Sequence, residues 1–190
     1  LWFIRTAIQH PFSIILFLFL FLFGAYFCAE RSPALGQETL GQEVLEQEAD
    51  IPIIGVIKSG ARAAIDATKN GKIGVIATEA TIGSGIYNRY IKENDANAAV
   101  LGKACPLFVP LVEEGLWEDP VTDEIAKRYL TELIDVGIDT LILGCTHYPM
   151  IRSTIGRIMG PDVTLVNPAY ETAHELKRLL QDTGLESGHR

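Results

Sequence analysis

A cysteine and a histidine, Cys145 and His147, stand two residues apart at the end of an apolar run, with Thr146 between them. A thiolate can attack a substrate or move a proton, and an imidazole beside it changes charge near neutral pH. The spacing alone leaves a second interpretation open. Free cysteines are often merely buried, so Cys145 is then a small core side chain and His147 an ordinary loop histidine.

The elements that position these side chains follow from the pattern around them. Residues 141–143 are continuously apolar, which is typical of a central strand in a parallel sheet. Gly144 permits a close turn, and a helical pattern begins near Pro149. Parallel sheets bind ligands at the carboxyl ends of their strands. Cys145 is therefore predicted at a strand tip, where the amides of a helix N-terminus favour the thiolate.

The same stretch, Gly-Cys-Thr-His-Tyr-Pro at residues 144–149, resembles the second catalytic-cysteine motif of the glutamate racemase family. Residues 53–57, 71–81 and 104–115 also resemble blocks of that family, in the same order. The resemblance covers residues 43–181. It favours glutamate racemases over aspartate racemases, whose second motif usually lacks the histidine and the proline.

The resemblance implies racemisation without cofactor or metal, in which two thiols flank the α-carbon of glutamate. Cys145 matches the thiol that takes the proton from L-glutamate, and His147 assists it. Glu113 resembles the acidic partner of the histidine, although the adjacent Glu114 fits the pattern as well. A solvated helix end is the simpler interpretation of both carboxylates.

Three threonines are implied to bind the substrate. Thr146 matches a residue that holds the α-amino or carboxylate group. Thr78 and Thr81, which follow a predicted strand, resemble the family's other contacts in this domain. Their alternative role is helix N-capping, which threonine commonly performs at such turns. Cys105, beside a proline and away from this cluster, is assigned a structural role.

The first catalytic motif of the family, Cys-Asn-Thr, has no counterpart in the sequence. At the matching distance upstream of residues 50–52 stands Ser-Pro-Ala-Leu-Gly, at residues 32–36. The chain therefore carries one thiol of the pair and is expected to be inactive alone. By resemblance it holds one complete domain of the aspartate/glutamate racemase type, a parallel-sheet α/β sandwich, plus the C-terminal segment that returns to the other domain.

The first 50 residues differ in composition from the remainder. Residues 6–29 contain no Lys, Arg, Asp or Glu, and residues 14–23 are all apolar. This stretch approaches the roughly 20 residues that cross a bilayer. It is either a membrane anchor through residues 12–29, a signal peptide, or translated sequence foreign to the protein; the cytosolic setting of the family favours the last. We divide the chain into a leader with an acidic linker, residues 1–50, and an α/β domain, residues 51–190.

Composition excludes several classes of function. A net charge of -8 and a pI near 5.0 argue against nucleic acid as a partner. Three widely spaced cysteines suggest neither a disulfide framework nor a zinc site. A reducing cytosol fits this cysteine usage best.

From residue 52 onward strand and helix patterns alternate, which predicts an α/β fold with a parallel sheet. Strands are predicted at residues 53–57, 72–77, 98–101, 141–143 and 163–166. Helices are predicted at residues 61–69, 83–94, 107–114, 120–136, 151–159 and 169–180.

The expected function is therefore that of a glutamate racemase, which interconverts L- and D-glutamate for peptidoglycan synthesis. A non-catalytic, membrane-anchored glutamate-binding or interaction module derived from a truncated racemase is the alternative. Expected partners are glutamate and either a second copy of the chain or a missing N-terminal half. A membrane is a partner only if residues 1–30 belong to the protein.

Overall fold

The structure, a computed structural model, describes residues 52–186. Its four strands form one parallel sheet in the order β2-β1-β3-β4. The strands are β1 (Lys72–Ala77), β2 (Ala99–Ala104), β3 (Thr140–Leu143) and β4 (Thr164–Val166). The helices are α4 (Val56–Ala67), α5 (Glu79–Ser84), α6 (Ile86–Asn94), α7 (Phe108–Glu113), α8 (Pro120–Val136), the 3-10 helix η1 (Tyr148–Ile151), α9 (Arg152–Met159) and α10 (Pro168–Asp182). The predicted α/β class is confirmed.

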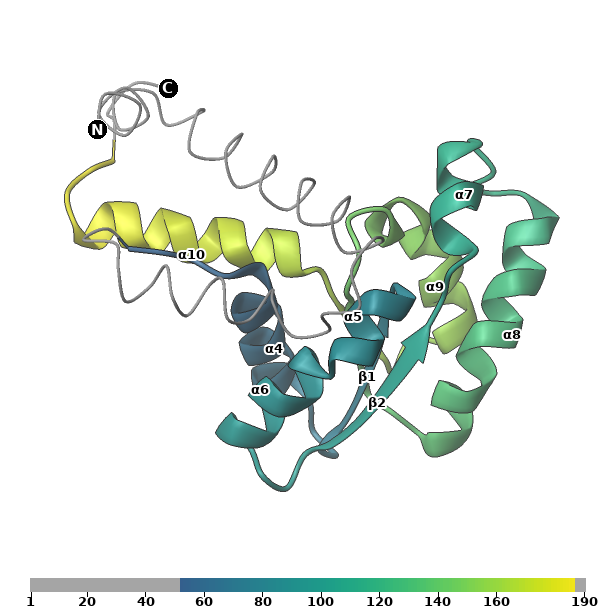
Figure 1. The fold of residues 1–190 in the computed structure, drawn as a ribbon, viewed down its shortest axis with the longest axis horizontal. Helices are drawn as coiled ribbons and strands as arrows, with labels where there is room; N and C mark the ends of the chain where they lie inside the picture. The colour runs from purple at the N-terminus through teal and green to yellow at the C-terminus, as the bar shows by residue number, and fades with distance from the viewer. Residues whose placement is uncertain (1–51, 187–190) are drawn as a thin grey trace. The chain divides into compact units, whose positions relative to one another are not determined.

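Helices cover both faces of the sheet, with α4 and α6 to the left of the labelled strands in Figure 1 and α8 to the right. Successive side chains of a strand point to opposite faces, so each strand feeds two cores. Leu141 and Leu143 pack with Ile76 against α7, α8 and α9. Ile142 packs with Val75 against α4 and α6. Because both faces are buried, these strands read as continuous apolar runs.

The chain changes direction across the sheet between β1 and β3. From β1 it moves outward to β2, then returns to the other side of β1 as β3 and continues to β4. The loops that follow β1 and β3 therefore lead to opposite sides, and ligands bind at such a switch point in open α/β sheets. The amide of Gly144 donates to the carbonyl of Ile76 at 2.8 Å, which holds the two loops side by side.

The strand predicted at residues 53–57 is wrong. Residues 52–55 have no regular structure, and α4 begins at Val56. A short apolar run does not distinguish a strand from one face of a helix. Here Gly60, Ala61 and Ala64 make a narrow buried face. A Cβ on Gly60 would lie 2.8 Å from the ring of Pro168, so α4 and the start of α10 meet closely.

The helix predicted at residues 83–94 is two helices. Gly85 ends α5 and precedes α6 with φ 65°, a left-handed conformation that glycine adopts without strain. The break redirects the first turn of α6, and Ile86 and Tyr87 become buried.

The buried side chains of α8 are Thr122, Ala126, Leu130 and Leu133, whereas Val136 is 42% exposed. Small and polar side chains thus make up part of its buried face.

Within residues 52–186 no helix is both long and apolar enough to span a membrane. The predicted anchor at residues 12–29, and the leader and linker as a whole, lie outside the described residues.

Asp139 joins the turn after α4 to the start of β3. Its carboxylate accepts hydrogen bonds from the Thr68 hydroxyl at 2.6 Å and from the amides of Lys69 and Asn70, both at 2.7 Å. Burial acts to raise the pKa of Asp139, but these bonds and one from the Thr140 hydroxyl outweigh it and hold the pKa below its usual value.

We expect Asp139→Ala to lower the free energy of unfolding at pH 7 by about 1–3 kcal/mol, because several donors lose their acceptor. Because folding lowers the pKa of this carboxyl group, its ionised form stabilises the folded state at pH values above the pKa of the unfolded chain, roughly 3.9. That stabilisation is lost as the pH falls through the pKa of the folded state. Urea unfolding at pH 7 and at pH 3 should therefore show a smaller difference in the free energy of unfolding between the parent and Asp139→Ala at pH 3. Asp135→Ala, an exposed carboxylate of α8, is the control. The same difference in the free energy of unfolding at both pH values would contradict a stabilising role of the ionised Asp139 carboxylate.

Candidate active site

Cys145 lies two residues beyond the end of β3, at the carboxyl edge of the sheet and beside the switch point. Its side chain is half-buried, and its Sγ is 3.8 Å from Nδ1 of His147. The strand tip predicted from the apolar run is where the structure places it.

The amides predicted to favour the Cys145 thiolate do lower its pKa, but burial, which the sequence did not predict, has the larger and opposite effect. Burial raises the pKa of the Cys145 thiol, because it penalises the charged form. The amides of His147, Thr146 and Tyr148 and the Thr146 hydroxyl donate hydrogen bonds that lower the pKa, but they do not cancel the effect of burial. The predicted hydrogen-bond donors are therefore present. Cys145 is a neutral thiol at rest, and these donors can stabilise the thiolate when it forms.

His147 connects Cys145 to a carboxylate. Its Nε2 lies 3.3 Å from Oε1 of Glu113, the last residue of α7, while its Nδ1 faces the thiol. Among residues 52–186, the carboxylate at ion-pair distance from this imidazole belongs to Glu113 rather than to Glu114. A thiol, an imidazole and a carboxylate in sequence form a path along which a proton can move.

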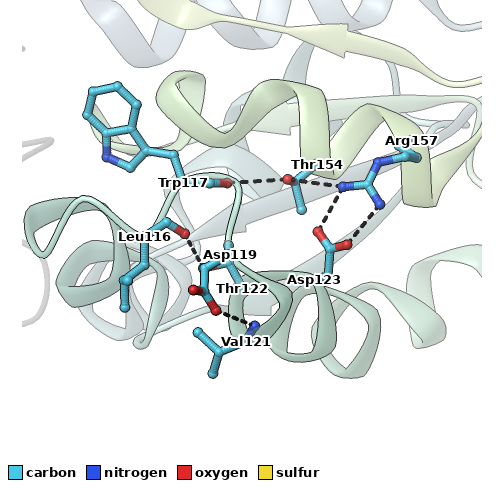
Figure 2. A network of polar contacts seen from close by, with 8 residues as sticks. All are labelled: Leu116, Trp117, Asp119, Val121, Thr122, Asp123, Thr154 and Arg157. Atoms are coloured by element: carbon cyan, nitrogen blue, oxygen red, sulfur yellow. Dashed lines mark hydrogen bonds and ion pairs between the residues drawn. The ribbon is translucent and has the colours of Figure 1, made fainter.

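A polar network holds the loop after α7, as Figure 2 shows. The indole Nε1 of Trp117 donates to the carbonyl of Val112 at 2.8 Å, and the Trp117 carbonyl accepts from the buried Thr154 hydroxyl at 3.4 Å. Arg157 pairs through two nitrogens with Asp123, at 2.9 and 2.8 Å. The network links the end of α7 to α8 and α9, which keeps Glu113 beside His147.

Thr78 directly follows β1, next to the switch point, and Thr81 lies in the first turn of α5. Thr78 caps α5 by accepting from the amide of Thr81 at 3.4 Å, and the two hydroxyl oxygens are 3.1 Å apart. The capping interpretation is therefore realised. One hydrogen bond between two hydroxyls uses one of their two hydrogens, so one O–H remains available for a ligand.

Thr146 is exposed at the surface beside the thiol. Its hydroxyl oxygen lies 3.4 Å from Nδ1 of His147. The structure thus brings Cys145, Thr146, His147 and Glu113 into one chain of contacts, while Thr78 and Thr81 lie at the start of α5, after the neighbouring strand β1.

Comparison with known proteins decides the family. A family model described as Asp/Glu/Hydantoin racemase matches residues 38–176. The chain belongs to this racemase family. It is 48% identical over 147 residues to the glutamate racemase of Chlorobaculum tepidum, covering 77% of this chain and 54% of that protein. It is 46% identical over 139 residues to the glutamate racemase of Geobacter metallireducens, covering 73% and 52%.

Solved racemase structures share the fold. Glutamate racemase isoform RacE1 from Bacillus anthracis matches with a TM-score of 0.73 and 44% identity, over 77% of this chain and 55% of that one. The Francisella tularensis glutamate racemase, solved in complex with D-glutamate, matches with a TM-score of 0.69 and 37% identity, over 77% and 54%. The racemase chain described here spans about half the length of the curated relatives it matches.

One buried residue of this racemase domain at the switch point was not predicted from the sequence. The ring of Tyr87 lies against Gly144, with Cε2 3.3 Å from the position that a Cβ on that glycine would take. The sequence predicts one continuous helix over residues 83–94. The break at Gly85 turns Tyr87 inward instead.

The second thiol of the described racemase residues, Cys105, lies in the core. Its side chain is fully buried, its Sγ donates to the carbonyl of Lys103 at 3.6 Å, and burial raises its pKa to about 12. The hydroxyl of Tyr148 donates to its carbonyl at 2.9 Å. These contacts agree with a structural role.

We expect Cys145 to react with iodoacetamide at pH 8 at least about tenfold faster than Cys105, because Cys145 is half-buried and has donors for its thiolate whereas Cys105 is fully buried. Tryptic peptides 104–127 and 129–152 separate the two thiols for mass spectrometry. Cys145→Ser should remove the fast phase. Equal rates for both thiols in folded protein would contradict the difference in environment.

Proposed function

We propose that this chain acts in the racemisation of glutamate, and that Cys145 is one of the two acid/base groups. The observation that carries the proposal is the placement of Cys145 at the sheet's switch point, 3.8 Å from His147, which is itself 3.3 Å from Glu113. The identity to proteins named glutamate racemases supports the choice of substrate.

The chemistry needs a base that is strong enough to remove an α-proton. A thiol whose pKa is raised gives a more basic thiolate than an ordinary cysteine does. His147 takes the thiol proton, and Glu113 stabilises the imidazolium that forms. The Cys145 thiolate then removes the α-proton of L-glutamate, and a thiol on the opposite face supplies a proton to that carbon. After this turnover His147 releases its extra proton to solvent and the thiolate on the opposite face takes one up, so no proton is gained or lost overall; in the reverse direction Cys145 returns a proton to the α-carbon.

In this proposal, hydroxyl groups of the chain donate hydrogen bonds to the substrate. Thr146 adjoins the thiol, and the Thr78–Thr81 pair has one hydroxyl hydrogen to spare at the start of α5. We propose that these groups hold the α-amino and carboxylate groups so that the α-hydrogen points at Cys145. The reaction requires no cofactor in this scheme.

The opposite thiol comes, in this proposal, from a facing half that corresponds to the part of the relatives outside the matched region. That half is another part of the polypeptide, a separate chain or a second copy. The product D-glutamate serves peptidoglycan synthesis, and the reaction takes place in the cytoplasm.

The test pairs this chain with the first half of the Chlorobaculum tepidum glutamate racemase, added in trans or fused ahead of residue 43. Circular dichroism follows the conversion of L-glutamate to D-glutamate. We expect turnover by the pair and none by either half alone. Turnover by this chain alone would mean that a second copy supplies the facing half or, if the monomer turns over, that no facing half is needed. Tight glutamate binding by the pair without turnover would favour the non-catalytic binding module instead.

A further inference from the structure

Tyr87 is the buried polar side chain at the switch point to which the proposed reaction assigns no role. It belongs to the first turn of α6 and is 5% exposed. Its ring covers Gly144, with Cε2 3.3 Å from the site of a Cβ there, and Gly144 directly precedes Cys145. The ring thus reaches the base of the Cys145 loop from the neighbouring helix.

The hydroxyl of Tyr87 is carried by a ring that contacts Gly144, the residue before Cys145. Burial raises the pKa of Tyr87 first of all, and the charge of an ionised Cys145 raises it further. Because its pKa is raised, the phenol stays protonated at neutral pH and remains a hydrogen-bond donor there. Among residues 52–186 this hydroxyl makes no hydrogen bond, and since no fully buried side-chain oxygen in that range lacks a partner, the hydroxyl oxygen keeps some contact with solvent.

We propose that Tyr87 is a positioning residue for Cys145: its hydroxyl donates a hydrogen bond, directly or through one water molecule, to the Cys145 thiolate when that thiolate forms. A hydrogen bond to a charged acceptor is stronger than one between neutral groups. In the structure, where the thiol is neutral, no described residue accepts a hydrogen bond from this hydroxyl. The proposal goes beyond the proposed function and shares with it only the ionisation of Cys145.

Other groups near the thiol must be separated from this effect. The amides of residues 146–148 are fixed backbone donors and do not titrate. His147 faces the sulfur at 3.8 Å, with Glu113 behind it on α7. On η1, the Tyr148 hydroxyl donates to the carbonyl of Cys105 at 2.9 Å. Removal of the Tyr87 hydroxyl leaves all of these groups in place.

The experiment measures the rate of iodoacetamide alkylation of Cys145 against pH in the full chain, read from peptide 129–152. Tyr87→Phe keeps the ring over Gly144 and removes the hydroxyl. We expect the midpoint of the profile to rise by about one pH unit, which is roughly a tenfold slower reaction below the midpoint. If the Tyr87 ring has only a structural role, the midpoint should not shift in Tyr87→Phe.

Tyr90→Phe is the matched control, because Tyr90 stands on the same helix and its hydroxyl accepts from Arg62 at 3.4 Å. Its profile should match that of the parent chain. Alkylation of buried Cys105 in the same samples reports loss of folding. Tyr87→Leu, which also lacks the hydroxyl, should shift the profile in the same direction as Tyr87→Phe. An unchanged profile in Tyr87→Phe, or a shift in the leucine variant alone, would overturn the proposal. Labelling needs no turnover, so either result is independent of the racemisation test.

Discussion

Replacement of Cys145 by serine in the chain paired with a racemase first half is expected to lower kcat by at least about 10²–10⁴-fold, in both directions of the reaction. A serine hydroxyl in the same place ionises far less readily than a thiol, so it cannot serve as the base. The donors around residue 145 remain, but they have no anion to stabilise. Circular dichroism with L-glutamate and with D-glutamate as substrate measures both rates.

Exchange of the α-hydrogen in D2O sharpens this prediction. The facing thiol still operates on D-glutamate, so we expect the Cys145→Ser pair to retain solvent exchange into D-glutamate and to lose it for L-glutamate. Cys105→Ala, which changes a buried thiol away from the switch point, is the control and should keep both activities. Equal loss of exchange for the two isomers would contradict the assignment of Cys145 to one face.

Gly144→Ala is expected to have the second largest effect, because it affects stability and the site together. A Cβ at this position would lie 2.9 Å from the backbone carbonyl oxygen of Ile76 and 3.1 Å from Cβ of Ala77. These atoms belong to the central strand and cannot move aside cheaply. We expect a loss of about 1–3 kcal/mol in the free energy of unfolding. A displacement of Cys145 by about 1 Å would cost roughly 10²-fold in turnover by the pair.

Gly156→Ala provides the comparison for that result. Its Cβ would meet Cδ1 of Leu165 at 3.5 Å, an ordinary contact, in the interior of α9. Alanine is the better helix former there, so the variant should be more stable than the parent by about 0.5–1 kcal/mol. Urea unfolding measures both variants. A Gly144→Ala protein as stable as the parent would show that the two loops are not held as closely as the structure indicates.

The network in Figure 2 gives a physical reason for the pairing of Glu113 with His147. Glu113 is largely exposed, with a side-chain accessibility of 62%, and a free surface carboxylate has little reason to stay in one place. Trp117 and Thr154 hold the loop that follows it, and through that loop the end of α7. The orientation of the histidine thus depends on contacts far from the thiol.

Much of the fold follows from the sequence alone. Residues 141–143 are continuously apolar because both faces of the central strands are buried. This pattern can be recognised in the sequence without knowing which helices pack against the strand. Cys145 at the strand tip and the α/β class follow from the same pattern. Failures came where a short apolar run suits two structures, as at residues 53–57, or where one glycine breaks a helical period, as at Gly85.

Within the site, the sequence by itself determined which side chains stand beside the thiol, because residues 145–148 are neighbours along the chain. The tertiary structure alone decided the order of the strands, the choice of Glu113 over Glu114, the inward turn of Tyr87 and the direction of the Cys145 pKa. The physical reason is the same in each case. Local donors are encoded next to the cysteine, but desolvation and long-range contacts depend on what packs around it, and those groups arrive from β1, α6 and α7.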